Sequence, residues 1–189
     1  MSPAGLRSGR TEAAARLDHP GIVPVYEVGS VDGRSYFSMK YIDGARLADE
    51  AIPIRPAAEL MAKVARTVHY AHEHGVLHRD IKPGNILLDK HGEPHLTDFG
   101  LARLLEKGSN VTRTLDVLGT PSYMAPEQAN GHHTDVTRAV DVYGLGAVFY
   151  HLLAGQPPFA GGTTYETLKL VLENEPRSPR LWNGARASS

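Results

Sequence analysis

The feature that most constrains this chain is the run His78-Arg79-Asp80-Ile81-Lys82-Pro83-Gly84-Asn85, followed thirteen residues after Asn85 by Asp98-Phe99-Gly100. The run supplies a carboxylate, an ammonium group and an amide, and the second motif adds another carboxylate. A third motif, Ala125-Pro126-Glu127, lies downstream. Carboxylate and amide oxygens suit Mg²⁺, and phosphoryl transfer from ATP uses an acidic residue, a lysine and such a metal site. The motifs therefore predict phosphoryl transfer.

In this order and at this spacing, the motifs match the catalytic loop, the metal-binding turn and the end of the activation segment of protein kinases. The chain resembles a bacterial serine/threonine protein kinase of the eukaryotic type over about residues 11 to 175. The resemblance implies an α+β fold, with a truncated β small lobe followed by a mainly α-helical large lobe. It also implies transfer of the ATP γ-phosphoryl group to serine or threonine hydroxyls of proteins, with ATP and Mg²⁺ as cofactors.

The resemblance assigns roles to the polar residues of the catalytic loop. Asp80 is expected to act as the base toward the substrate hydroxyl, and Lys82 to contact the transferred phosphate. Asn85 and Asp98 are expected to hold Mg²⁺. Thr120 resembles the family threonine that bridges Asp80 and Lys82.

Regulation is expected to involve Arg79, since an arginine before the catalytic aspartate marks family members controlled by phosphorylation. The long polar segment 101–120 is typical of a functional loop. A phosphate on Thr112 or Thr114 is expected to pair with Arg79 and to order this segment. Asp141 resembles the carboxylate at a helix start that braces the backbone of the catalytic loop.

The adenine site is expected near two strand-like segments, Ile22–Val28 and Arg34–Ile42, joined by a turn at Asp32-Gly33. By resemblance, the second segment runs into the hinge between the lobes. Met39 is then the gatekeeper, Leu87 forms the floor under the adenine, and the hinge backbone comes from Lys40, Tyr41 and Ile42. Without the downstream motifs, a plain two-stranded ribbon would be the better interpretation.

The large lobe is predicted from helical patterns. Apolar residues recur at helical spacing from Ala57 to His74, and Gly75 is expected to end that helix. Residues Val140–Ala154 are apolar nearly all round and predict a buried helix. Thr163-Thr164-Tyr165-Glu166 has the pattern of a capping box at the start of a last helix.

Shorter elements are expected between these helices. Leu47–Ile52 is predicted to be a short helix. Strands Ile86–Leu88 and His95–Thr97 are predicted to form a hairpin that brings Asp98 beside Asn85.

The expected organisation has four parts: a disordered start at 1–10, a remnant of the small lobe and hinge at 11–42, an incomplete large lobe at 43–175, and a frayed tail at 176–189. No Gly-x-Gly-x-x-Gly pattern precedes the first strand, and the first lysine is Lys40, already in the hinge. Glu12, the candidate partner of the small-lobe lysine, lies slightly closer to His19-Pro20 than is usual in the family. We therefore expect weak or no activity from the chain alone.

The far end also departs from the family, which continues with further helices and an arginine that pairs with the glutamate of the third motif. Glu127 is therefore expected to lack its partner, which is costly in a partly buried site. Apolar surface on the large lobe is expected to be exposed. The sequence accordingly predicts low stability or self-association through this surface.

Composition narrows the partners and the location. The chain is 41% hydrophobic and 22% charged, which is typical of a globular protein. Its net charge of −1 gives no reason to expect nucleic acid or an anionic membrane as a partner. The absence of cysteine excludes disulfides. The apolar stretch Val142–Ala154 is too short to span a bilayer and no signal peptide is recognised, so a cytoplasmic protein is expected.

Alternatives from other classes stay open. A pseudokinase-like binding module would keep the fold and bind a partner without transferring phosphate. His69 and His72 share a helix face and could ligate zinc, although no cysteine or carboxylate completes a tetrahedral set. Asp80 and Asp98 as the acid and base of a glycosidase would leave Lys82 and Asn85 unexplained.

Overall fold

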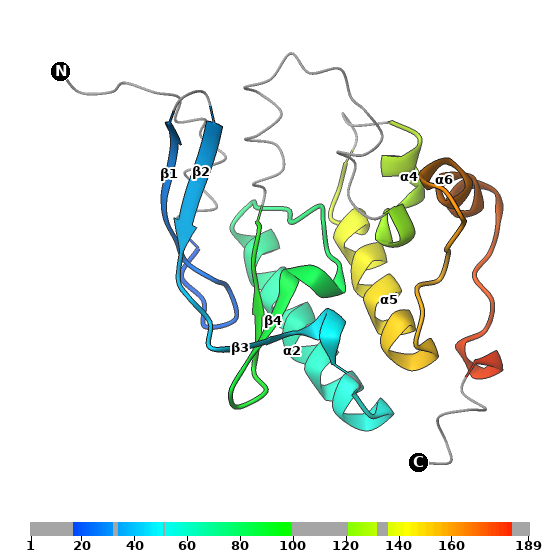
Figure 1. Cartoon of the computed structure of the whole chain (residues 1–189), viewed down its shortest axis with the longest axis horizontal. Coiled ribbons are helices and arrows are strands. Elements are labelled where there is room, and N and C mark those ends of the chain that lie inside the picture. Colours follow the sequence, from blue (N-terminus) through cyan, green and yellow to red (C-terminus); the bar gives the residue numbers. More distant parts are fainter. Residues whose placement is uncertain (1–16, 32–33, 51, 100–120, 132–135, 183–189) are drawn as a thin grey trace.

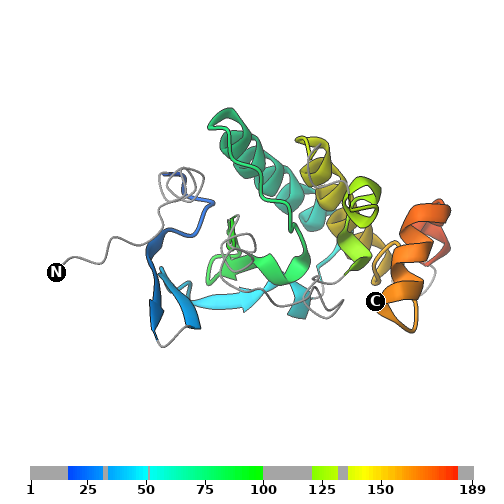
Figure 2. The same ribbon diagram turned by 90° about the horizontal axis from the view of Figure 1, so that it is seen from above.

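The structure is a computed structural model of the 189-residue chain. It describes residues 17–31, 34–50, 52–99, 121–131 and 136–182. A two-stranded ribbon stands at one end of the molecule, beside a mainly helical body (Figures 1 and 2). This arrangement agrees with the predicted α+β class.

The ribbon consists of β1 (Val25–Val31) and β2 (Arg34–Met39), which pair antiparallel. Both strands differ from the predicted ranges. Residues 21–23 instead bind strand β5 (Pro94–Leu96) of the body: Val23 N donates to Leu96 O at 2.8 Å, and Leu96 N donates to Gly21 O at 2.8 Å. The turn expected at 32–33 lies outside the described residues.

A second sheet supports the catalytic loop. It has the order β3-β4-β5, with antiparallel pairing between β3 (Gly44–Arg46), β4 (Ile86–Asp89) and β5 (Pro94–Leu96). The β4–β5 hairpin was predicted, whereas β3 was not. A single 3₁₀ turn, η1 (Leu47–Asp49), replaces the short helix predicted after it.

Helix α2 (Ile54–Glu73) forms the centre of the body. It begins three residues before the predicted start. Pro56 does not prevent this, because it falls in the first turn, where a backbone N–H has no helical partner. Gly75 ends it with φ 72°, as predicted. Gly75 N donates to His72 O and Val76 N donates to Ala71 O, which is the Schellman arrangement that turns the chain toward the catalytic loop.

Helix α5 (Ala139–Ala154) packs against α2, as Figure 1 shows. The prediction of a helix is confirmed, but burial all round is wrong, because the outer face of α5 leaves Val142 62% exposed. The body continues with α4 (Pro126–Ala129), α6 (Thr164–Glu173) and the 3₁₀ turns η2 (Pro83–Asn85), η4 (Pro121–Tyr123) and η5 (Pro179–Leu181).

The capping box predicted for α6 forms in part. Glu166 N donates to the Thr163 hydroxyl at 3.1 Å, but the Glu166 carboxylate accepts from Gly162 N instead of Thr163 N. The tail also departs from expectation, because η5 precedes Trp182, whose Nε1 donates to the Tyr150 hydroxyl at 3.2 Å. The segment predicted to be frayed therefore contains a 3₁₀ turn that contacts α5.

The hydrophobic core lies between α2, α5 and the β3-β4-β5 sheet. The apolar residues of α2 that recur at helical spacing are buried, except Ala65, which is exposed. The core joins these elements through side chains that include Leu60, Val64, Val68, Ile86, Leu96 and Val148. It thereby holds the catalytic loop, which follows α2 and ends with η2.

Candidate active site

The side chains of the catalytic loop converge on Asp80. Lys82 Nζ lies 2.7 Å from Asp80 Oδ2. Asn85 Nδ2 donates to the same oxygen at 3.0 Å and to the Asp80 carbonyl at 2.8 Å. The spacing of the motif explains the geometry, since the turn η2 folds Asn85 back over the start of the loop. Lys82 and Asn85, both with predicted catalytic roles, are thus within hydrogen-bonding distance of Asp80.

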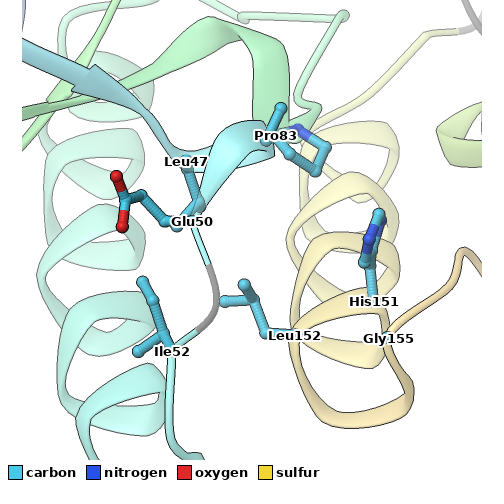
Figure 3. A pocket seen from close by; sticks show the side chains of 8 residues that line it. Leu47, Glu50, Ile52, Pro83, His151, Leu152 and Gly155 are labelled. Atoms are coloured by element: carbon cyan, nitrogen blue, oxygen red, sulfur yellow. The ribbon is translucent and has the colours of Figure 1, made fainter.

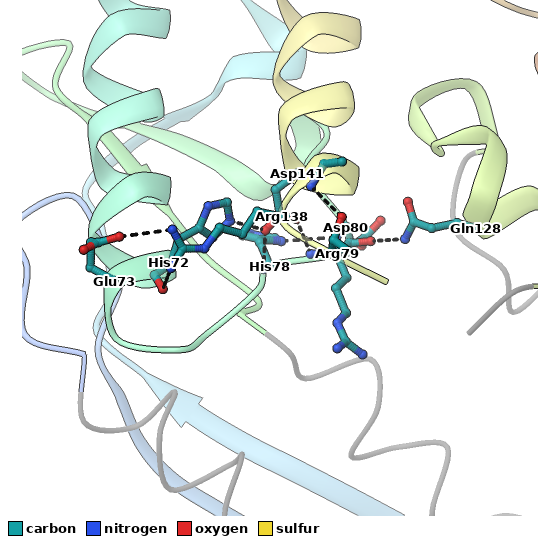
Figure 4. A network of polar contacts seen from close by, with 10 residues as sticks. His72, Glu73, His78, Arg79, Asp80, Gln128, Arg138 and Asp141 are labelled. Atoms are coloured by element: carbon teal, nitrogen blue, oxygen red, sulfur yellow. Dashed lines mark hydrogen bonds and ion pairs between the residues drawn. The ribbon is translucent and has the colours of Figure 1, made fainter. Parts of the chain in front are cut away.

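Asp141 braces the backbone of the loop, as expected. The carboxylate is fully buried near the start of α5 and accepts hydrogen bonds from His78 N at 2.9 Å and Arg79 N at 2.6 Å (Figure 4). His72 Nε2 lies 2.8 Å from Asp141 Oδ2. The bracing of Asp141 by His72 was not predicted, because His72 lies 69 positions earlier in the sequence.

Gln128 and Arg138 also contribute contacts that sequence reasoning missed. Gln128 Nε2 donates to the carbonyl of Arg79 at 2.9 Å. Arg138 donates to His72 O at 2.9 Å and to Glu73 Oε1 at 3.1 Å, and so holds the last turn of α2. Both contacts connect segments that are far apart in the chain, and no local motif marks them.

His78 is buried and fixed by hydrogen bonds on both ring nitrogens. Asp80 N donates to Nδ1 at 3.3 Å, so Nε2 carries the proton and donates to Thr97 O at 3.0 Å. Burial lowers the pKa of His78, although Asp141, Asp80 and Asp98 act in the opposite direction. The ring also packs on Phe99, with centroids 4.6 Å apart.

The two candidate metal ligands are brought together by the β4–β5 hairpin. Thr97 N donates to Asn85 O at 3.0 Å, which places Asp98 next to Asn85. The side-chain nitrogen Nδ2 of Asn85 faces Asp80. The side-chain oxygen Oδ1 of Asn85 is therefore the atom that could bind a cation. One carboxylate and one amide oxygen suit Mg²⁺, which takes few protein ligands when phosphates supply the others. These residues therefore fit the expected ion.

The predicted adenine-binding residues lie on two elements. Met39 ends β2, where its sulfur accepts a hydrogen bond from the Thr97 hydroxyl at 3.2 Å. Lys40 N donates to Pro24 O at 3.0 Å, and Tyr41 is 82% exposed. Leu87 is half-buried on β4, between the buried Ile86 and Leu88. Lys40 and Ile42, which are expected to lie in the hinge, also line a pocket of about 290 Å³ together with His95.

A small cavity of about 30 Å³ adjoins the catalytic loop through Pro83 (Figure 3). Glu50, Leu152 and His151 also line it. Nδ1 of His151 hydrogen bonds with the hydroxyl of Tyr123, which precedes the third motif. Burial raises the pKa of Tyr123 to about 12, so its hydroxyl keeps its proton at neutral pH.

Several predicted residues lie outside the described part of the chain, namely Thr112, Thr114, Thr120, Glu12 and residues 1–10. Glu127 is described, and no ion pair to it forms within the described residues. It lies near Tyr143, whose pKa is raised mainly by burial and also by Glu127 and Glu175.

The histidines do not gather into a metal site in the described part of the chain, where no group of three or more histidine and acidic side chains could hold an ion. His72 is committed to Asp141, and His69 is exposed on α2. Among the described helices, none has the length and apolar character needed to cross a membrane.

Comparison with known proteins finds similarity to protein kinases. Residues 10–183 match the family described as Protein kinase domain. The chain is 41% identical over 188 residues to the DNA damage-responsive serine/threonine-protein kinase RqkA of Deinococcus radiodurans, covering 95% of this chain. It is 39% identical over 176 residues (88% of the chain) to the serine/threonine-protein kinase PknB of Mycolicibacterium smegmatis, and 38% identical over 185 residues (94%) to PrkC of Bacillus subtilis. It spans 28% of the length of each of these relatives.

Proposed function

The chain belongs to the protein kinase domain family, and we propose that it transfers the γ-phosphoryl group of ATP to serine or threonine hydroxyls of a protein substrate. The observation that carries the proposal is the cluster in which Lys82 and Asn85 both contact Asp80 Oδ2. This cluster uses the residues that a two-acid glycosidase would leave without a role. The names of the relatives, all serine/threonine-protein kinases, support the substrate class.

Each group of the cluster has a task in this reaction. The Asp80 carboxylate orients the attacking hydroxyl and accepts its proton as the hydroxyl oxygen bonds to the γ-phosphorus and the bond from that phosphorus to the oxygen of the leaving ADP breaks. The Lys82 ammonium, held beside Asp80, offsets negative charge on the phosphoryl group in transit. Bound Mg²⁺ would supply charge neutralisation on the nucleotide phosphates, and the oxygens of Asn85 and Asp98 would hold it.

The remaining assignments belong to the same proposal. Adenine binds along the backbone at Lys40, Tyr41 and Ile42, next to Met39 and above Leu87. Thr120 bridges Asp80 and Lys82, and phosphorylation of Thr112 or Thr114 acts through Arg79. The chain self-associates through exposed apolar side chains of the large lobe. The cytoplasmic location stays a prediction.

The proposal predicts that Asp80→Asn lowers phosphate transfer by at least about 100-fold, because loss of a general base costs this much. Transfer from radiolabelled Mg-ATP to the chain itself and to a generic protein substrate measures it, with circular dichroism to confirm folding. Glu59→Gln makes the same carboxylate-to-amide change on the exposed face of α2 and should keep the wild-type rate.

Two results would contradict the proposal. The first is transfer that survives unchanged in Asp80→Asn. The second is no transfer by a folded wild-type chain, which would favour the pseudokinase-like binding module. Nucleotide and partner binding would then become the properties to measure.

A further inference from the structure

We propose that Gln128 is a positioning residue for the catalytic loop, acting through the backbone on the N-terminal side of Asp80. The inference rests on the proposed kinase function and adds a residue to it. Gln128 lies on α4, directly after the Ala125-Pro126-Glu127 motif, and its amide reaches the loop from a distance of 49 positions in the sequence (Figure 4).

The catalytic loop needs such a contact because of the backbone conformation of Arg79. Its φ of 69° is in the left-handed region, which is strained for a residue with a side chain. Such a conformation persists only where surrounding contacts hold the peptide units on either side of it. The peptide unit before Arg79 is held by Asp141 Oδ1, which accepts from Arg79 N at 2.6 Å.

The peptide unit after Arg79 is held at both of its ends. Its carbonyl, Arg79 O, accepts from Gln128 Nε2 at 2.9 Å. Its N–H, which belongs to Asp80, donates to His78 Nδ1 at 3.3 Å. Because this unit leads directly into the Cα atom of Asp80, its orientation sets where the Asp80 carboxylate points. Gln128 supplies the contact at its carbonyl end.

Glutamine is suited to this task because its amide has a donor end and an acceptor end. Gln128 Oε1 accepts from Ala125 N at 3.2 Å and caps the first turn of α4, while Nε2 donates to the catalytic loop. Glutamate would keep the cap, but it would place a carboxylate oxygen against the Arg79 carbonyl. The two functions of the side chain can therefore be separated by one substitution.

Gln128→Glu is the variant that tests the proposal. We expect kcat to fall about tenfold, the size expected for loss of one hydrogen bond that holds reacting groups. The KM for ATP should change less than about twofold, since ground-state binding of nucleotide is not altered. The thermal midpoint should fall by only a few degrees, because one hydrogen bond is lost while the cap is retained. Asn130→Asp adds the same charge at the other end of α4 and should leave both kinetic constants unchanged.

A second measurement does not depend on catalysis. In the ¹⁵N-labelled chain, exchange of the Asp80 amide proton with solvent should be about tenfold faster in Gln128→Glu than in the wild type, because the peptide unit loses one of its two anchors. In the wild-type chain, the side-chain amide protons of Gln128 should show nuclear Overhauser contacts to the backbone around Arg79 and Asp80.

These outcomes separate the inference from the proposed function. A wild-type chain that transfers no phosphate would defeat the kinase proposal, while amide exchange would still decide the role of Gln128. Unchanged kcat and unchanged exchange of the Asp80 amide in a folded Gln128→Glu would overturn the inference. If that variant does not fold, absence of the Overhauser contacts in the wild-type chain would overturn it.

Discussion

At the scale of single residues, backbone strain coincides with the proposed chemistry. Arg79 and Asp98 have φ values of 69° and 65°, a conformation that costs roughly 1–2 kcal/mol for a residue with a Cβ atom. The first precedes the proposed base, and the second is itself a proposed metal ligand. Contacts from outside the loop hold Arg79, so the free energy of packing elsewhere in the body maintains the geometry of the site.

His78 should make the stability of the chain depend on pH. Burial lowers its pKa below the usual value of 6.5, so the unfolded state binds the proton first as pH falls. Stability is therefore greatest above about pH 6.5 and falls as pH drops from there toward the lowered pKa of the folded state. Urea unfolding of the wild type at several pH values between 5 and 8 should show this loss.

The contribution of His78 can be isolated by comparison. His78→Gln should lose less stability than the wild type over the same pH range, because the group that takes up the proton on unfolding is gone. The three acidic side chains that face His78 remain in both proteins. His69→Gln, at an exposed position of α2, should keep the wild-type dependence. Equal pH dependence in His78→Gln and the wild type would show that His78 is not the source.

Some residues of the site belong to one local sequence motif, whereas others are far apart in the sequence. Asp80, Lys82 and Asn85 lie within six residues, so their meeting is a local property that the sequence reveals. Gln128 contacts the loop across 49 positions, and His72 contacts Asp141, which braces the loop, across 69 positions. Such contacts depend on how helices pack, and the chemistry of glutamine or histidine alone does not signal them.

At the scale of elements, the approach of α5 to the catalytic loop depends on Gly144. A Cβ atom there would lie 3.0 Å from Ile81 Cβ and 3.2 Å from Ile81 O, whereas one at Gly146 would have nothing within 4 Å. Gly146→Ala should stabilise the chain by up to about 1 kcal/mol, the usual gain in a helix interior. Gly144→Ala should show little of this gain and should slow phosphate transfer, because Ile81 follows Asp80.

Thermal unfolding and the transfer assay on both variants test this expectation. The two substitutions are chemically identical and lie on the same helix, so helix propensity cancels between them. An equal rise of the thermal midpoint in both variants, with unchanged phosphate transfer, would mean that the catalytic loop accommodates the added methyl group without loss of stability or activity.

The predictability of elements follows their length and the strength of their pattern. Helix α2 has 20 residues with a clear apolar face and was predicted, apart from its start. Strand β3 has three residues and no alternation long enough to detect. The start of the first ribbon strand is misplaced because Ile22 and Val23 are apolar but lie beside β5 instead of in the ribbon.

At the scale of the whole molecule, the ribbon and the body differ in how they bury apolar side chains. The body has a shared core of α2, α5 and the β3-β4-β5 sheet. The ribbon has two strands, and Val28, Phe37 and Met39 remain 43%, 37% and 37% exposed. Isolated two-stranded ribbons are marginally stable. The ribbon therefore depends on contacts such as that between Met39 and Thr97.

Exposed apolar side chains also lie on the large lobe and on the η5 turn that follows it, where Val142, Tyr165 and Leu181 are 62%, 69% and 71% exposed. Large exposed apolar side chains favour association when they are gathered on one surface. Sedimentation velocity should show species larger than the monomer that increase with protein concentration. The variant Val142→Thr/Tyr165→Ser/Leu181→Ser should remain monomeric, because burial of these side chains stabilises contact between copies.

A matched variant distinguishes the large lobe from the ribbon. Tyr26 and Val31 in the ribbon, and Tyr41 just after it, are 68%, 60% and 82% exposed. Tyr26→Ser/Val31→Thr/Tyr41→Ser therefore removes a similar amount of exposed apolar surface from the other end of the molecule. If the large lobe mediates association, this variant associates like the wild type. If it is monomeric instead, copies of the chain meet through the ribbon, whereas a wild-type chain that is monomeric at every concentration contradicts association through either surface.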